Sequence, residues 1–314
     1  MTTWEYRQVP FKFQLSDWTL FSIVCPLQVR AMKLIDTPPI EGLVPPIDSL
    51  SGDSQGFSVR ALRIATELPT VSTSGDYLCY TQLQYRHFFI DLEQSFEDYQ
   101  TKFSSKTRST INRKIKKYAE HCGSSIPWKA YKTPAEMPEF LKLARQISTK
   151  TYQENLLDAG IPDSEEFASE MEALAGKDRV RAYLLFDGPH PVAYLYCPVD
   201  DGVLIYAYLG YDPAYMKMSV GTVLQWLAVE HIFAESCFKF FDFTEGQSEH
   251  KRLFATNEIR CANVIFLKKS LRNKALIYSH LFMGQFSKWL GDSLAKLGIK
   301  ARIKQFIRSM RLPR

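Results

Sequence analysis

The pattern of apolar and polar positions is clearest between residues 126 and 220. IPWKAY, from Ile126, reads as a strand, and TPAEMPEFLKLARQISTKTYQ after it as a helix with Pro134 at its first position. A second helix is expected over DSEEFASEMEALAG, which begins with an Asp or Ser cap and closes on Gly176. VRAYLLF, PVAYLYCPV and VLIYAYLGY follow as strands, joined by DGPH and VDDG, which are typical of tight hairpins. We therefore predict an antiparallel meander.

The next segment, GTVLQWLAVEHIFAES from Gly221, is apolar on both sides at helical spacing, which predicts a buried helix. A short aromatic strand (KFFDF), a glycine turn, a charged helix and a last strand come after it. The order is strand, two helices, three antiparallel strands, helix, strand, helix, strand. Because this is not the alternation of a doubly wound sheet, the predicted fold class is α+β.

The N-terminal third has weaker patterns. WTLFSIVC and YRHFFIDL are strand-like, and residues 37–57 between them are rich in Pro, Gly and Ser and predict a loop. A helix follows, capped by Ser104 or Ser105 and ended by Gly123. Its segment 102–117 holds seven basic residues and no acid, and could bind a phosphate, an anionic acceptor or RNA, or simply face solvent.

Composition places the chain among ordinary soluble proteins, with 46% hydrophobic and 23% charged residues. No apolar run reaches the roughly 20 residues of a membrane span, and the N-terminus lacks the features of a signal peptide. The six cysteines show neither a disulfide nor a zinc pattern, so we expect reduced thiols. These features favour a cytoplasmic protein.

Charge is concentrated at the C-terminus. The net charge is +5, but residues 268–314 hold twelve Lys or Arg and one acid, a net +11. Within this segment, SLAKLGIKARIKQFIRSMRLPR is amphipathic. It is expected either to pack on the core or to lie on an anionic membrane surface, which would make the protein peripheral at the inner membrane face.

The turn Ser219-Val220-Gly221-Thr222 stands directly before the buried helix. The free backbone N–H groups at a helix start attract anions, and Gly221 would let a phosphate approach the backbone. The alternative is that Ser219 is a simple cap of a core helix.

Three segments together resemble a known superfamily. FSSKTRSTINRKIKK, YDPAYMKMSVGTVL and FDFTEGQSEHKRLF occur in this order over roughly residues 100–268. The combination resembles the GNAT acyltransferases, in particular the branch of the Fem-type peptidyl ligases and the acetyltransferases associated with cellulose and exopolysaccharide synthesis. The common GNAT phosphate motif, Arg/Gln-x-x-Gly-x-Gly/Ala, is matched only at Gly221, since Met216 and Ser219 occupy its first two fixed positions.

The resemblance implies a GNAT-like, largely antiparallel mixed sheet flanked by helices, in two tandem lobes of which the first is degenerate. The expected organisation is a degenerate lobe over 1–120, an acyl-CoA-binding lobe over 121–268 and a basic helical tail over 269–314. The resemblance also implies that acyl-CoA, such as acetyl-CoA, is the co-substrate and that the site contains no metal. The acceptor would be an amine of an amino sugar or amino acid, used in surface polysaccharide biosynthesis.

The resemblance assigns donor-binding residues as well. Backbone groups of Tyr208, Leu209 and Gly210 would hold pantetheine, and the turn formed by Ser219, Val220, Gly221 and Thr222 would hold the pyrophosphate. Tyr211, or Tyr208, would protonate the leaving thiolate. Lys251 matches a lysine of the family motif and could pair with a phosphate, a sugar acid or Asp242.

Deprotonation of the attacking amine requires a base, and Asp242 at the end of its strand is the first choice. Asp212, Glu230, Glu245 and His250 are the other candidates. Asp212 is more typical of a turn residue, and His250 is expected to face away from Lys251 because adjacent helical residues do not share a face. His231 is expected to be a satisfied core histidine.

Two other functions fit the sequence. One is a non-catalytic scaffold with a degenerate acyltransferase fold, docked at the inner membrane. The other is an aminoacyl-tRNA-dependent ligase of the Fem type. The chain lacks the long helical arm of many such ligases, so a nucleic acid partner is not expected.

Overall fold

The computed structural model describes residues 4–15, 18–36, 50, 52–151 and 160–296. Contacts divide the chain into two compact units, Met1–Tyr85 with Arg260–Arg314 (unit 1) and Arg86–Ile259 (unit 2). Two long strands run from one unit into the other, β5 (Tyr77–Asp91) and β12 (Asn257–Lys268). Each unit is described here by itself.

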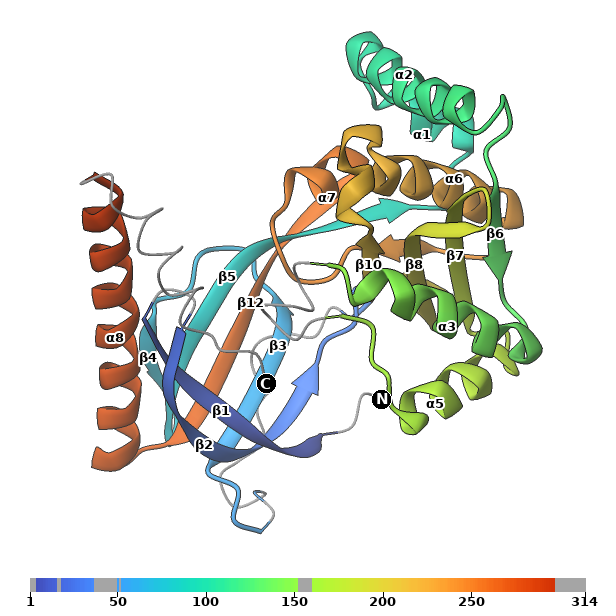
Figure 1. Ribbon diagram of the computed structural model, residues 1–314. Coiled ribbons are helices and arrows are strands. Elements are labelled where there is room, and N and C mark those ends of the chain that lie inside the picture. Colours follow the sequence, from blue (N-terminus) through green and yellow to red (C-terminus); the bar gives the residue numbers. More distant parts are fainter. Residues whose placement is uncertain (1–3, 16–17, 37–49, 51, 152–159, 297–314) are drawn as a thin grey trace. The chain divides into compact units, whose positions relative to one another are not determined.

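Unit 1 is built on strands from both ends of the chain (Figure 1). β1 (Glu5–Leu15) is antiparallel to β2 (Trp18–Ala31), which runs parallel to β3 (Gly56–Arg63). β3 is antiparallel to β12, and β4 (Val71–Ser74) is antiparallel to β5. Helix α8 (Leu271–Lys296) packs on β1, where its Leu276 and Ile277 join the cluster that contains Val9 and Phe11.

Unit 2 contains a sheet in the order β5–β11–β9–β8–β7–β6, with β10 paired to β8. The strands are β6 (Trp128–Tyr131), β7 (Val180–Asp187), β8 (His190–Asp200), β9 (Val203–Ile205), β10 (Tyr208–Tyr211) and β11 (Phe240–Asp242). All pairs are antiparallel except β9 with β11. The helices are α1 (Phe96–Thr101), α2 (Ser105–His121), α3 (Met137–Ser148), α5 (Glu165–Ala175), α6 (Val220–Glu235) and α7 (Glu249–Phe254). The 3-10 helices are η2 (Pro134–Glu136) and η3 (Pro213–Met218).

Helices cover both faces of the unit 2 sheet. Along β7, Tyr183 and Leu185 pack with the α6 cluster, whereas Ala182 and Leu184 pack with the cluster of α3 and α5. Because successive strand residues point to opposite faces, a sheet covered on both faces needs uninterrupted apolar strands. This explains why the meander strands have almost no polar positions.

Local capping signals in the sequence set the helix starts. The side chains of Ser104 and Ser164 accept hydrogen bonds from Thr107 N and Phe167 N. Thr133 forms a capping box with Glu136, directly before Pro134. The predicted strands, meander and most helices are confirmed, with the last predicted meander strand divided into β9 and β10. The helix expected from Pro134 begins as η2 and continues as α3 to Ser148.

The α+β fold class is confirmed, with a large, mostly antiparallel sheet and flanking helices. The unit boundaries differ from the expected ones at 120 and 268. Residues 86–120 belong to unit 2 because Tyr99 and Tyr118 lie in the α6 cluster, and residues 260–268 belong to unit 1 because β12 pairs with β3. That the N-terminal part is a degenerate GNAT lobe stays a prediction.

Two predicted segments extend beyond the residues that the structure describes. The helical tail expected over 269–314 is described as α8 as far as Lys296, and its remainder, like most of the expected loop over 37–57, lies outside the described residues. Among the helices of the described ranges, none is both long and apolar enough to cross a bilayer.

Candidate active site

The sheet of unit 2 opens at the end of β9. β11 pairs with β9 as far as Asp242 and Ile205, and Tyr206 N still donates to Asp242 O at 2.8 Å. The chain then continues as β10, which pairs only with β8. The second edge of β10 therefore has no strand partner in the described part of the chain, and its backbone borders an opening.

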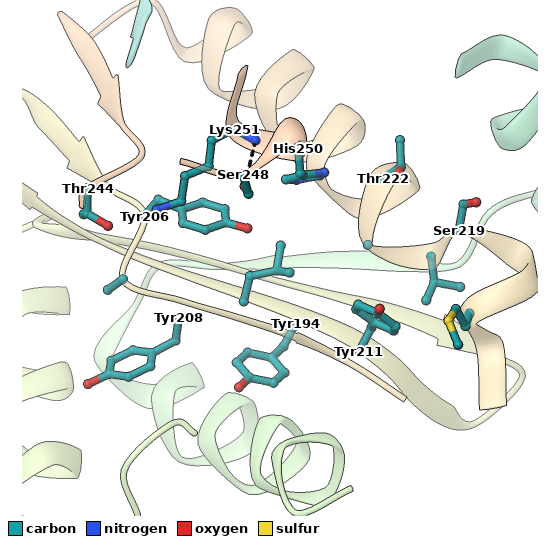
Figure 2. Close-up of a pocket in the computed structure, with 15 residues that line it drawn as sticks. Tyr194, Tyr206, Tyr208, Tyr211, Ser219, Thr222, Thr244, Ser248, His250 and Lys251 are labelled. Carbon is teal, nitrogen blue, oxygen red and sulfur yellow. Dashed lines mark hydrogen bonds between the residues drawn. The ribbon is translucent and has the colours of Figure 1, made fainter. Parts of the chain in front are cut away.

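A cavity of about 560 Å³ occupies this opening (Figure 2). Its wall combines β10, the start of α6 and the start of α7. The lining side chains include four tyrosines, three hydroxyl residues from the α6 and α7 turns, and two basic residues, namely Tyr194, Tyr206, Tyr208, Tyr211, Ser219, Thr222, Ser248, His250 and Lys251. Of the residues first chosen for catalysis and donor binding, all but Gly210 and Asp242 line the cavity. Of the other candidate bases only His250 lines it, whereas Asp212, Glu230 and Glu245 do not.

The start of α6 presents unbonded amides to the cavity. Ser219 has left-handed backbone angles (φ 55°, ψ 36°), and its side chain makes no capping hydrogen bond. Its carbonyl accepts from Thr222 N at 2.9 Å and from Val223 N at 3.1 Å. Within the described residues no acceptor is found for the amides of Val220 and Gly221. The alternative that Ser219 caps the helix with its side chain is therefore wrong.

Helix α2, which contains most of the basic segment that the sequence offered for phosphate binding, adds positive charge at this point. Lys114 Nζ lies 3.5 Å from Thr222 Oγ1, and Lys117 Nζ donates to Lys217 O at 3.1 Å. Lys114 is half-buried, whereas Arg113, Lys116 and Lys117 are exposed to solvent. Unbonded amides, a hydroxyl and a lysine at a helix start make an anion-binding arrangement.

A carboxylate fixes α2 beside the turn. Asp187 Oδ2 accepts from Tyr215 Oη of η3 at 2.7 Å and lies 3.1 Å from His121 Nε2 of α2. Tyr118 Oη of α2 donates to Phe186 O at 2.7 Å. The hydrogen bonds from Tyr215 and His121 lower the pKa of Asp187, so its carboxylate stays charged at neutral pH.

Lys251 lies on the wall opposite β10. Ser248 caps α7 by accepting from Lys251 N, and Lys251 Nζ donates to Glu245 O at 2.6 Å. The ammonium also lies 5.9 Å from the ring centre of Tyr206. Burial lowers the pKa of Lys251, while the charges of Asp242 and Glu245 act in the opposite direction.

His250 lines the cavity next to Lys251, and the two side chains point in different directions, as expected for neighbours on a helix (Figure 2). The cavity extends around the first turn of α7 and therefore meets both side chains (Figure 2). His250 Nε2 is buried and has no hydrogen-bond partner among the described residues. Burial and the charges of Lys114 and Lys251 lower the pKa of His250 to about 4, so its imidazole is neutral at pH 7.

Asp242, the predicted base, lies behind this wall. Its side chain is buried, forms a short contact with His87 Nε2, and accepts from Thr244 N at 2.6 Å. It does not line the cavity. A direct role of Asp242 in deprotonating a substrate therefore has no support in this geometry.

Two predicted glycines have close neighbours. A Cβ on Gly210 would meet the ring of Tyr194 at 2.4 Å, which leaves no room for a side chain. A Cβ on Gly221 would lie 3.4 Å from the ring of Tyr211, so that ring covers the first turn of α6. Asp212 accepts from Ala214 N at 3.0 Å and pairs with Lys150, as expected for a turn residue.

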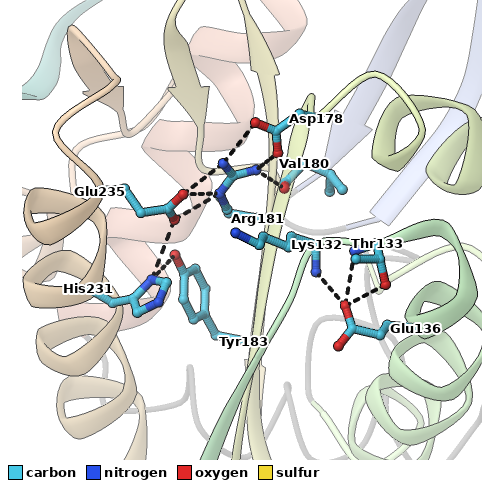
Figure 3. Close-up of polar contacts among 9 residues, drawn as sticks. All are labelled: Lys132, Thr133, Glu136, Asp178, Val180, Arg181, Tyr183, His231 and Glu235. Carbon is cyan, nitrogen blue, oxygen red and sulfur yellow. Dashed lines mark hydrogen bonds and ion pairs between the residues drawn. The ribbon is translucent and has the colours of Figure 1, made fainter.

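The far end of α6 is held by a buried arginine (Figure 3). Arg181 of β7 is 2% exposed and donates to Glu235 at 2.8 Å and to Asp178 at 2.7 Å. These hydrogen bonds raise the pKa of Arg181 against the opposing effect of burial. His231 lies within 3.5 Å of Glu235 and is half-buried rather than in the core. The network anchors α6 to the sheet away from the cavity.

Comparison with known proteins gives one family match. Residues 105–252 match the family model described as an acetyltransferase (GNAT) domain. The matched range runs from α2 to α7 and contains every residue that lines the cavity. None of the curated proteins compared with this sequence matches it significantly. No comparison points to the cellulose-associated branch, which stays a prediction.

Several solved structures are similar over about 72% of this chain. The C-terminal domain (DUF2156) of a protein described as a lysylphosphatidylglycerol synthetase from Agrobacterium fabrum is 8% identical, with a TM-score of 0.47 over 72% of its own length. L-PGS from Bacillus licheniformis is 14% identical, with a TM-score of 0.44 over 72% of its length. FemX is 9% identical, with a TM-score of 0.45 over 75% of its length. At such values these likenesses do not specify a function.

Proposed function

We propose that this protein is an acyltransferase that moves an acyl group from acyl-CoA to an amine. One arrangement carries the proposal, the cavity between the unpaired edge of β10 and the open first turn of α6. The strand edge offers backbone groups to a pantetheine arm, and the turn offers the amides of Val220 and Gly221 to a pyrophosphate. The match of residues 105–252 to a GNAT domain supports the same assignment.

The phosphate end of the donor lies, in this proposal, at Thr222 and Lys114. Met216 stands where the common GNAT motif has Arg or Gln and offers no N–H donor, and in this proposal Lys114 supplies a donor to the phosphate instead. Because a charge-assisted hydrogen bond is about twice as strong as a neutral one, Lys114 is expected to matter more for donor affinity than Ser219.

The reaction forms a C–N bond and breaks the C–S bond of the thioester. The neutral amine attacks the thioester carbonyl, and the ammonium group of Lys251 stabilises the oxygen that becomes negative. The amine loses one proton, and the departing thiolate gains one, so amide and free CoA are the products. Tyr211 or Tyr208 is the donor to the thiolate.

For the proton of the amine, His250 is better placed than Asp242. His250 lines the cavity and its imidazole is neutral at pH 7, although its lowered pKa makes it a weaker base than an ordinary histidine, whereas the carboxylate of Asp242 is held by His87 and Thr244 behind the wall. Asp242 then acts as a positioning residue, whose charge counteracts the lowered pKa of Lys251. The acceptor in this proposal is an amino sugar or amino acid.

Calorimetric titration with acetyl-CoA and longer acyl-CoAs tests the donor site. The wild-type protein should bind with micromolar affinity, and Lys114→Met should bind at least about tenfold more weakly, since it loses one charge-assisted contact. Lys116→Met is the matched control, because this lysine belongs to the same helix and its side chain is 79% exposed. It should bind like the wild type.

Absence of acyl-CoA binding to a folded sample would overturn the proposal. The aminoacyl-tRNA-dependent ligase and the non-catalytic scaffold would then remain. Equal weakening by Lys114→Met and Lys116→Met would show a general effect of charge and would remove Lys114 from the site.

A further inference from the structure

Helix α8 of unit 1 carries an apolar stripe on its solvent side. The stripe consists of Leu271, Ala275, Tyr278, Phe282, Phe286 and Trp289, which follow one another at intervals of three or four residues and are all exposed. Such spacing puts them on one side of the helix. Phe282 is 68% exposed and Trp289 is 62% exposed. We call this set the outer stripe.

The outer stripe is not the face that holds α8 to its own unit. Leu276 and Ile277 are buried against β1, and His280 Nδ1 lies 2.8 Å from Tyr80 Oη. These residues occupy the opposite side of the helix, about half a turn away from Phe282. α8 therefore has two apolar faces, one packed on the sheet and one open to solvent.

The open face is long and aromatic. Phe282 and Phe286 stack at 6.3 Å between ring centres, and Phe286 lies 5.9 Å from Trp289. From Leu271 to Trp289 the stripe extends for about 27 Å at the helical rise of 1.5 Å per residue. A continuous apolar surface of this kind on a soluble domain indicates an interaction site.

Charge selects among possible occupants. Arg272, Lys274 and Lys288 are exposed on the same helix, and residues 268–314 carry a net charge of +11. A second copy of the chain would bring two such positive regions together, which is unfavourable. An anionic lipid surface has the complementary charge, and tyrosine and tryptophan favour the level of the lipid headgroups.

We propose that α8 docks the protein on an anionic lipid surface through its outer stripe. The helix lies in the plane of the interface, with the aromatic rings between the headgroups and the basic side chains at the lipid phosphates. The inference is independent of the proposed acyltransferase function, because the outer stripe belongs to unit 1 and the cavity to unit 2.

Vesicle co-sedimentation of the full chain tests this proposal. Binding is expected to vesicles of phosphatidylcholine that contain phosphatidylglycerol. Binding to vesicles of phosphatidylcholine alone should be much weaker, and high salt should weaken binding to both kinds of vesicle. The variant Phe282→Gln with Trp289→Gln should bind at least tenfold more weakly and keep its unfolding temperature, since both side chains are exposed in the folded protein.

A matched control removes equally exposed apolar side chains elsewhere in unit 1. Trp18 is 57% exposed and Leu20 is 47% exposed on β2, so Trp18→Thr with Leu20→Thr should leave vesicle binding unchanged. Wild-type-like binding by the α8 variant, or no binding to anionic vesicles by the wild type, would overturn the proposal. So would a dimer in sedimentation velocity that the α8 variant converts to a monomer, because the stripe would then hold a second copy.

Discussion

His250 and Lys251 show at the scale of single residues how the cavity sets charge. The two side chains come from the first turn of one short helix and line the same space. Burial lowers the pKa of both, but only Lys251 has carboxylates nearby, Asp242 and Glu245, that oppose this effect. The pair thus offers the neutral imidazole of His250 beside the ammonium group of Lys251, which has Asp242 and Glu245 as neighbours.

The lowered pKa of His250 predicts a loss of stability in acid. The folded value is about 4 and the usual value is 6.5, so between these pH values the unfolded chain binds more protons than the folded one. The free energy of unfolding should therefore fall as the pH decreases from 6.5 to 4, by at most about 3 kcal/mol from this group. Urea unfolding at pH 7 and 4.5 measures the effect.

His250→Gln should remove this part of the pH dependence, whereas the same change at the exposed His190 should not. An unchanged acid sensitivity in His250→Gln would show that other groups cause it.

Lys251→Met should lower kcat/KM for acyl transfer by about 100-fold or more, as expected when a group that stabilises the developing oxyanion is removed. Lys251→Arg keeps the charge and should retain part of the activity. Steady-state kinetics with acetyl-CoA and an active amine would measure both, with Lys217→Met in η3 as a control outside the cavity wall. Wild-type kcat/KM in Lys251→Met would contradict the catalytic role.

At the scale of elements, α6 is supported differently at its two ends. Its first turn leaves amides unbonded and borders the cavity, whereas its last turn is fixed by Arg181 through Glu235. The unbonded amides in the first turn of α6 can stay in place for a ligand only if the rest of the helix is held rigidly. The buried ion pair at the other end supplies an anchor of this kind.

Arg181→Met should destabilise unit 2 by about 3 kcal/mol, because it leaves the poorly exposed carboxylate of Glu235 without its partner. Adding Glu235→Gln should restore at least about 1 kcal/mol, since the stranded charge is gone. Chemical unfolding of the single and double variants gives both values. Arg179→Met, at a 41% exposed ion pair with Asp200, is the control and should cost less than about 1 kcal/mol. Additive losses in the double variant would argue against an anchoring pair.

At the scale of the whole molecule, the chain builds unit 1 from its two ends and unit 2 from its middle. The core of unit 1 therefore joins residues that are more than 250 positions apart, such as Phe11 and Ile277. The clusters in unit 2 form from residues 88–255 alone. This division predicts that the two cores respond separately to mutation.

Ile277→Ala should destabilise unit 1 by about 2–4 kcal/mol, since this side chain is 1% exposed. Amide hydrogen exchange is expected to become faster in β1 and β2 and to stay unchanged in β7 and β8. Leu184→Ala in unit 2, which is fully buried, should give the reverse pattern. Equal acceleration in all four strands by either variant would show one cooperative core.

The local part of this structure could be predicted from the sequence. Ser104 and Ser164 begin their helices as expected, because a capping side chain acts within three residues of its own position. Thr133 begins the short η2 that leads into α3. The meander and the buried α6 could be predicted from apolar runs and hairpin turns, because these signals also lie within the segment that they describe. The turn from Ser219 to Thr222 could be chosen as a candidate site because helix starts have unbonded amides in any fold.

Only the tertiary structure decided which distant side chains meet. Lys114 contacts Thr222, which is 108 residues away in the sequence, and His87 contacts Asp242, which is 155 residues away. Neither pair leaves a periodic signal, because each depends on the packing of α2 on α6 or on the pairing of β5 with β11. The sequence alone also does not show which apolar face of α8 is buried. Only the structure shows that the sheet covers the face of Leu276 and Ile277 and leaves the outer stripe exposed. Sequence alone thus determined the elements and a candidate turn, while packing determined the charges around the cavity.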